Sequence, residues 1–337
     1  MISYITSVAT IGAITAILCL GVNVSWGWVG QLDLAYYAYV AVGAYSASVL
    51  ELPRNIPQPG LNYSYILGLH WPFLLGVAGA AVVGGIVSAI VGTIALRRVR
   101  SDYIAIITAV TALMAAAFLG QSPYLFGGQI GTYGIPLPFQ SSLNLGTQGY
   151  NFFFLGLMLV FLALTYAVLQ LLFKSPFGRS LRAVREGDVA ASAFGRNLFS
   201  VRLRAYIVGG TVGAFGGALF VNYISAWNPS SWNIFEVVLI LSGVVVGGRA
   251  NSIGVIIGSV LVLSIIPEVT RLISVFGGSA ADGPAVAALL AALLIIVILR
   301  FRPAGLVPER KLTSSEPQAP SAAAANANAS LSTRVGA

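Results

Sequence analysis

Hydrophobic residues follow one another along most of this chain in runs of 15 to 25 residues. A helix that crosses the hydrocarbon core of a membrane needs about 20 apolar residues. No run alternates with a period of two, as the strands of a membrane barrel do. The pattern therefore predicts an all-α fold, a polytopic integral membrane bundle of about 8–10 transmembrane helices. The runs are Tyr4–Val24, Leu34–Leu50, Pro72–Leu96, Tyr103–Leu119, Asn151–Phe173, Ala205–Ile224, Ile234–Gly248, Gly254–Phe276 and Pro284–Leu299.

Two of the shorter runs, Leu34–Leu50 and Ile234–Gly248, each adjoin an interruption made of glycines and polar residues. The interruptions read GWVGQLDL at Gly27–Leu34 and GVVVGGRANSIG at Gly243–Gly254. Paired broken segments in the two halves of a membrane protein are typical of a transport pathway. We therefore expect one or two broken or re-entrant segments. The candidate pathway residues are Gly27, Gly30, Gln31, Asp33, Gly247, Gly248 and Asn251.

Asp33 has two interpretations. A carboxylate within a membrane is costly unless it faces water, a partner or a pathway. Leu34 opens the next hydrophobic run, so Asp33 also stands where a negative side chain caps the start of a helix. The sequence leaves both roles open.

Composition excludes a soluble protein and gives no support to an enzyme. The chain is 57% hydrophobic and 8% charged, against about 25% charged residues in soluble domains. Cys19 and His70 are the only residues of their types, so we expect neither a disulfide nor a metal site. The sequence lacks the glycine-rich loop that cradles phosphates. We expect no cofactor, and any ATP that drives transport would be bound by a separate chain.

The positive charges are clustered. Of the 18 Lys and Arg residues, three lie at Arg97–Arg100, seven at Lys174–Arg204 and four at Arg300–Lys311. An even number of hydrophobic runs separates each pair of clusters, so all three can face the cytoplasm, where short basic loops remain. This predicts a cytoplasmic C-terminus and an extracytoplasmic N-terminus. The net charge of +8 alone would be compatible with nucleic-acid binding, but this clustered distribution of the cations argues against it.

The segment Lys174–Arg204 predicts an amphipathic element on the cytoplasmic face. Arginines recur at intervals of three and so lie together on a helix surface. Gly195 is suited to end this helix and Gly187 could break it earlier, so one helix or two remains open. A helix lying on anionic headgroups and a helix that docks a partner are both compatible with this spacing. The apolar stripe comprises Leu181, Val184, Ala191 and Phe194.

The remaining segments are two long loops within the membrane domain and a C-terminal tail of different composition. Glu51–Trp71 and Gly120–Tyr150 are the long outer loops, and the second is predicted to fold as an extracytoplasmic cap. Residues 312–337 are mostly Ala, Ser, Asn and Pro and predict a disordered cytoplasmic tail. The transmembrane domain is thus expected to span residues 1–311, with the basic cytoplasmic segment at 174–204.

Several segments together resemble the permeases of branched-chain amino acid ABC importers, over about Leu20 to Pro308. They are GVNVSWGWVGQLDLAYYAYVAVGAYSASVL, LRRVRSDYIAIITAV, FGGQIGTYGIP, SPFGRSLRAVREGDVAASAFGRN and VVVGGRANSIGVIIGSVL. VAASAFG at Val189–Gly195 is similar to the EAA-xxx-G coupling loop of such importers, with valine in place of the acidic residue. GQLDLAY departs from the usual GQ-x-S-L-G-H at Asp33, Ala35 and Tyr36, which leaves the solute open and includes urea and short amides.

The resemblance implies a multi-subunit importer in a bacterial inner membrane. Its expected partners are two cytoplasmic ATPase subunits, a second homologous permease subunit and an extracytoplasmic solute-binding protein. The ATPase contact is expected at Gly178, Arg179, Arg182, Arg185, Glu186, Ala190, Ala191 and Gly195. A secondary transporter or channel that works alone is the alternative from another class. The stretch Tyr103–Phe173 disfavours it because that stretch contains no charged residue.

Overall fold

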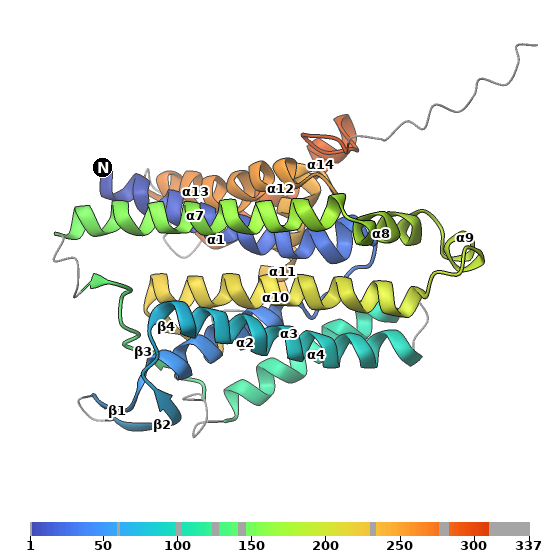
Figure 1. Ribbon diagram of the computed structural model, residues 1–337. Coiled ribbons are helices and arrows are strands. Elements are labelled where there is room, and N and C mark those ends of the chain that lie inside the picture. Colours follow the sequence, from blue (N-terminus) through green and yellow to red (C-terminus); the bar gives the residue numbers. More distant parts are fainter. Residues whose placement is uncertain are drawn as a thin grey trace, which may run out of the picture.

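A computed structural model describes residues 2–58, 61–98, 103–122, 128–140, 146–229, 234–275 and 283–309. Most of these residues are helical, and the helices run lengthwise through one bundle (Figure 1). Each of the nine predicted hydrophobic runs coincides with one helix or one continuous helical segment, which confirms the predicted helical bundle. These are α1 (Ile2–Val22) continuing as the π-helix η1 (Asn23–Trp28), α2 (Tyr36–Glu51), α3 (Phe73–Arg98), α4 (Ile104–Gly120), α7 (Thr147–Lys174), α10 (Leu198–Ile224), α11 (Ile234–Gly247), α12 (Ser252–Ser259) continuing through η4 (Val260–Ile265) into α13 (Ile266–Val275), and α14 (Gly283–Phe301).

Five segments within the described ranges are long and apolar enough to cross a membrane. They are Ile2–Trp28, Phe73–Arg97, Thr147–Lys174, Leu198–Ile224 and Ser252–Val269. The segments of α3 and α7 leave large apolar side chains exposed, among them Ile94, Val160 and Leu171. Such continuous apolar surface is stable against lipid rather than water. The chain is therefore a multi-pass membrane protein.

The core forms where α10 packs against α1, α2 and α3. Small residues permit this close approach: a Cβ added at Gly209 would lie 3.0 Å from the Gly21 carbonyl oxygen, and one at Gly217 would lie 2.1 Å from that of Val40. Glycine at these positions therefore lets the helix backbones lie in contact.

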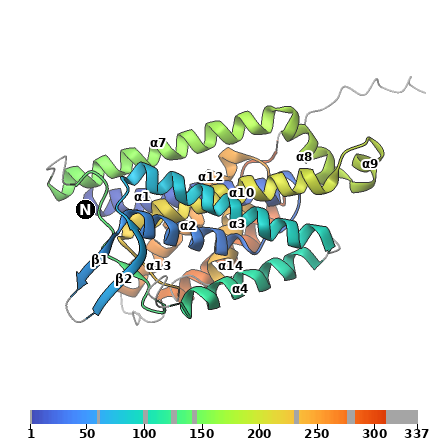
Figure 2. The same cartoon turned by 60° about the horizontal axis from the view of Figure 1, so that its bottom comes forward.

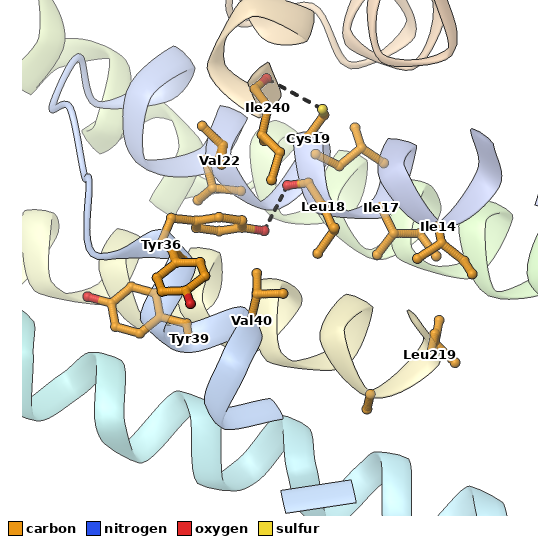
Figure 3. Close-up of a cluster of buried hydrophobic side chains, with 14 of the residues drawn as sticks. Ile14, Ile17, Leu18, Cys19, Val22, Tyr36, Tyr39, Val40, Leu219 and Ile240 are labelled. Carbon is orange, nitrogen blue, oxygen red and sulfur yellow. Dashed lines mark hydrogen bonds between the residues drawn. The ribbon is translucent and has the colours of Figure 1, made fainter. Parts of the chain in front are cut away.

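The centre of this core contains a buried tyrosine and the single cysteine (Figure 3). The Tyr36 hydroxyl donates to the Leu18 carbonyl at 2.7 Å. Cys19 is buried, as expected for a small core residue, and its thiol donates to the Ile240 carbonyl at 3.6 Å. These contacts join α1 to both α2 and α11.

One end of the bundle carries short strands that the helix-forming pattern did not predict. The strands β1 (Pro53–Gln58) and β2 (Leu61–Leu69) form an antiparallel hairpin within the first long loop. β3 (Thr132–Tyr133) pairs with β4 (Ala226–Trp227), so part of the second long loop is folded against α10. We call this the hairpin end. The predicted tail at 312–337 lies outside the described residues.

The described members of the three cation clusters gather at the opposite end, which we call the basic end. It carries the end of α3, the short helices α8 (Pro176–Glu186) and α9 (Asp188–Ala193), and the end of α14 (Figures 1 and 2). The Arg97 guanidinium lies 5.6 Å from the Phe199 ring, and Arg185 pairs with Glu309 at 2.7 Å. The clusters, which are separated by even numbers of hydrophobic runs, thus lie at one shared end of the bundle.

Candidate functional site

The basic segment Lys174–Arg204 folds into α8, α9 and the start of α10 (Figure 2). Gly187 separates the two short helices, which decides between one helix and two. Gly195 has a φ of 72°, and the Arg196 N–H donates to the Ala191 carbonyl at 3.1 Å. This is the C-terminal hydrogen bond of a Schellman motif, so Gly195 ends the segment as predicted.

The predicted apolar stripe is correct for three of its four members. Leu181, Val184 and Ala191 are buried against the bundle. The assignment of Phe194 to this stripe is wrong, because its side chain is 86% exposed and does not share the buried face of the other three. Val189 on α9 is also exposed, at 84%. The break at Gly187 redirects the chain, so the periodicity of α8 does not continue through α9.

The eight predicted coupling residues divide between two faces of this segment. Arg179, Glu186, Ala190 and Gly195 are exposed, whereas Gly178, Arg182, Arg185 and Ala191 are buried or half-buried. We call the exposed set, together with Val189 and Phe194, the outer face. The helix α9, which carries part of this set, lies at the tip of the molecule (Figures 1 and 2).

The inner face of α8 contacts the end of the first membrane segment. The Arg182 guanidinium lies 4.7 Å from the centre of the Phe173 ring, which itself lies 4.8 Å from the Trp28 ring. Arg185 Nη1 donates to the Gly27 carbonyl at 2.6 Å. A cation is favourable at the C-terminal end of a helix. Of the two arginines predicted to meet a partner, Arg185 therefore joins α8 to η1 directly, and Arg182 does so through Phe173 of α7.

The first predicted break is present, and it follows η1. Gly30 has a φ of 81°, and its N–H donates to the Trp26 carbonyl at 3.1 Å. The Gln31 N–H donates to the Ser25 carbonyl, also at 3.1 Å. The Gln31 side chain is buried, and neither of its amide atoms has a hydrogen-bond partner within the described residues.

Asp33 lies in this break, just before α2. Its Oδ1 accepts a hydrogen bond from the Ala35 N–H at 2.9 Å, and its side chain is 3% exposed. Burial raises the pKa of the Asp33 carboxyl above its usual range, and the hydrogen bond from Ala35 opposes that rise. This hydrogen bond forms a turn that leads into α2. The N-cap of α2 is Ala35 and the helix begins without a side-chain capping hydrogen bond, so the capping interpretation of Asp33 is not confirmed.

The second predicted break separates α11 from α12. Gly247 is the last residue of α11, and Gly248 has a φ of 110°. Asn251 caps α12, because its Oδ1 accepts from the Ile253 N–H at 3.1 Å. Its Nδ2 donates to the Pro308 carbonyl at 3.1 Å. The predicted residues Gly247, Gly248 and Asn251 thus form one turn.

The two breaks meet, although 220 or so residues separate them along the chain. Asn23 Oδ1 accepts a hydrogen bond from the Ala250 N–H at 2.9 Å, and both residues are buried. The Arg249 guanidinium lies 5.3 Å from the Trp26 ring. Asn23 was not predicted, although a lone amide side chain inside a hydrophobic run is a recognisable signal of such a contact.

Residues 302–309, which follow α14 and which we call the strap, dock on the second break. The Leu306 N–H donates to the Val246 carbonyl at 2.9 Å, and the Val307 N–H donates to that of Gly247 at 3.1 Å. The strap thus reaches the last turn of α11, whose carbonyls lack partners further along the helix. The sequence analysis did not predict this contact.

A cavity of about 520 Å³ lies near the hairpin end, far from both breaks. Its size is within the range of small-molecule sites, about 300–1,000 Å³. Hydroxyl, amide and aromatic side chains line it, and no charged side chain of the described residues does. They include Ser7, Thr10, Tyr150, Asn151, Phe154 and Tyr223.

Residues 4–302 match the family described as the permease component of branched-chain amino acid transport systems. A high-affinity branched-chain amino acid transport system permease protein of Salmonella typhimurium, LivM, is 28% identical over 89% of this chain and 69% of its own length. A probable LivM of Methanocaldococcus jannaschii is 27% identical over 64% of this chain and 62% of its own length.

A relative with another printed solute also matches. The nucleoside ABC transporter permease protein NupC of Lactococcus lactis is 32% identical over 50% of this chain and 54% of its own length. No solved structure matches this chain. The similarity to permeases therefore rests on sequence, and the arrangement of the two breaks and the α8–α9 segment comes from the fold described above.

Proposed function

Because this chain belongs to the family of permease components of branched-chain amino acid transport systems, we propose that it is the membrane-spanning translocation subunit of a binding-protein-dependent ABC importer. One observation carries the mechanism. The segment α8–α9 presents an exposed outer face, while on its inner face Arg185 donates to the Gly27 carbonyl of η1 and Arg182 lies over Phe173, whose ring in turn contacts Trp28 of η1. A partner that pushes on the outer face would move the broken helix directly.

The proposed importer requires several partners. Two cytoplasmic ATPase subunits supply the energy, and one of them docks on the outer face of α8–α9. ATP is bound by these subunits, and this chain needs no cofactor of its own. A second, homologous permease subunit completes the translocation path. A solute-binding protein delivers its cargo to the hairpin end, and nucleic acid has no part in the complex.

The membrane orientation places the basic end in the cytoplasm. The end of α3, the segment α8–α9 and the end of α14 share that end, and short basic segments remain cytoplasmic. The N-terminus then lies outside the cytoplasmic membrane of a bacterium and the C-terminus inside. Residues 1–311 form the permease domain, and 312–337 form a cytoplasmic tail.

The solute is a branched-chain amino acid, as the family description states for its members. The cavity near the hairpin end suits a small molecule with an apolar side chain, because Phe154, Tyr150 and Tyr223 offer aromatic surface beside hydroxyl and amide groups. The match to a nucleoside permease makes nucleosides a second candidate class. Urea and short amides are a third, suggested by the altered GQLDLAY segment.

Reconstitution tests this proposal. The chain is incorporated into liposomes with the second permease subunit, the ATPases and the binding protein encoded beside its gene, and uptake of labelled leucine, uridine and urea is measured. We expect ATP-dependent uptake of leucine. A matched complex, in which the ATPases bind ATP without hydrolysing it, controls for binding alone and should show no accumulation.

Two outcomes would contradict the proposal in different ways. Uptake by this chain without any ATPase would favour a secondary transporter or channel. ATP-dependent uptake of uridine or urea, with none of leucine, would keep the importer and change its solute.

A further inference from the structure

From the inner face of α8, Arg185 contacts the first helix break and the strap that docks on the second. Its Nη1 donates to the Gly27 carbonyl at 2.6 Å, and its Nη2 donates to Glu309 Oε2 at 2.7 Å. Its aliphatic carbons pack on Gly30, where an added Cβ would lie 3.1 Å from Arg185 Cγ. The planar guanidinium suits this role, because its donors point in fixed and different directions.

The first contact acts on η1. The carbonyls of Ser25 and Trp26 accept from the backbone of the break itself, and Arg185 supplies a charged donor to the next carbonyl, that of Gly27. A cation at the end of the 27-residue segment Ile2–Trp28 also interacts favourably with the helix dipole. Movement of Arg185 therefore alters the end of a membrane-spanning helix.

The second contact acts on the turn between α11 and α12. Glu309 is the last described residue of the strap, which is hydrogen-bonded to Val246 and Gly247 and held by Asn251. Force on Glu309 is thus transmitted to the second break. The side chains of Arg185 and Glu309 are 24% and 29% exposed. Partly exposed ion pairs are weak, so this contact can break and re-form during a transport cycle.

We propose that Arg185 is the positioning residue that couples movement of α8–α9 to the two helix breaks at once, an inference that rests on the proposed importer function. It acts through the Gly27 carbonyl and through Glu309, and it is not an ATPase contact. The docked ATPase meets the outer face, and Arg185 conveys the displacement inward. Loss of Arg185 therefore leaves the complex assembled but separates ATP hydrolysis from transport.

The test compares variants in the reconstituted complex. The readout is the ratio of labelled leucine taken up to ATP hydrolysed, together with the amount of ATPase that co-purifies. Arg185→Ala should keep ATPase recruitment and lower the ratio at least about fivefold, the lower limit of typical coupling between sites. Arg185→Lys should restore the ratio only partly, because an ammonium is a compact point charge without the guanidinium's two-direction fork. Arg300→Ala, which removes an exposed arginine from the same end, should leave the ratio unchanged.

Glu309→Gln tests the second contact alone and should lower the ratio less than Arg185→Ala. It also decides the matter if Arg185→Ala fails to assemble, since an unchanged ratio in Glu309→Gln would then overturn the proposal. An assembled Arg185→Ala complex with the wild-type ratio would overturn it as well. If the wild-type complex shows no ATP-dependent uptake, the importer function fails instead, before any variant is compared.

Discussion

At the scale of single residues, Gly30 occupies a position that suits glycine alone. Its φ of 81° lies in the left-handed region, and an added methyl group would lie only 3.1 Å from Arg185 Cγ. We expect Gly30→Ala to lower the free energy of unfolding by about 1–2 kcal/mol, the cost of a left-handed conformation for a residue with a Cβ. It should also displace Arg185 and reduce uptake. Thermal unfolding of the detergent-purified protein measures the first effect.

Gly156→Ala is the matched control, because a Cβ at this position in α7 has no neighbour within 4 Å. A glycine in a helix interior is less stable than alanine by about 0.5–1 kcal/mol, so the control should be neutral or stabilising. Equal destabilisation by both substitutions would contradict the role assigned to Gly30.

Residue roles that depend on neighbours in sequence were the most predictable. Gly195 ends the α8–α9 segment through its own φ and a hydrogen bond from the next residue. Asp33 accepts a hydrogen bond from the Ala35 N–H, two residues ahead, and forms the turn that leads into α2. In contrast, the hydrogen bonds of Asn23 with Ala250 and of Arg185 with Gly27 each join residues that are more than 150 positions apart in the sequence. No periodicity encodes such pairings, so the sequence indicated the polar residues but not their partners.

At the scale of elements, hydrophobic length predicted the helices well because each membrane segment must satisfy its own backbone. The short runs at α2 and α11 adjoin the breaks as expected. The hairpin β1–β2 and the strap could not be predicted in this way. Their hydrogen bonds depend on where other elements lie, as the bonds from the strap to Val246 and Gly247 illustrate.

The outer face of α8–α9 carries the second prediction. Phe194 is 86% exposed, so Phe194→Ser should not change the stability of the isolated chain. Buried aromatic anchors dominate many protein interfaces, so the same change should weaken ATPase recruitment about tenfold or more. Co-purification at graded ATPase concentrations measures this.

Phe301→Ser provides the comparison, since Phe301 is 79% exposed at the end of α14 and lies outside that face. It should leave recruitment unchanged. If both serine variants weaken recruitment equally, the outer face is not the specific docking site.

At the scale of the whole molecule, the distribution of charge and the distribution of exposed apolar side chains both follow the long axis of the bundle. The basic end and the hairpin end lie at opposite ends of helices whose sides expose residues such as Ile94 and Leu171. Lipid can cover these sides, whereas the charged and strand-forming ends suit water. A binding protein at one end and ATPases at the other would then act on a single bundle, linked through α1 and α10.

This axis gives the last prediction, which concerns orientation in the membrane. In a Cys19→Ala background, which removes the only cysteine, single cysteines replace Val189 on α9 and Gln121 beyond the end of α4. Both positions are exposed. A membrane-impermeant maleimide should label Gln121→Cys in intact spheroplasts and Val189→Cys only in inside-out vesicles, because basic segments remain cytoplasmic. Permeabilised membranes control for reactivity, since both cysteines should then be labelled. Labelling of both from one side would contradict the separation of the ends, and the reverse pattern would place the ATPase-docking face outside the cell, where no ATP could drive it.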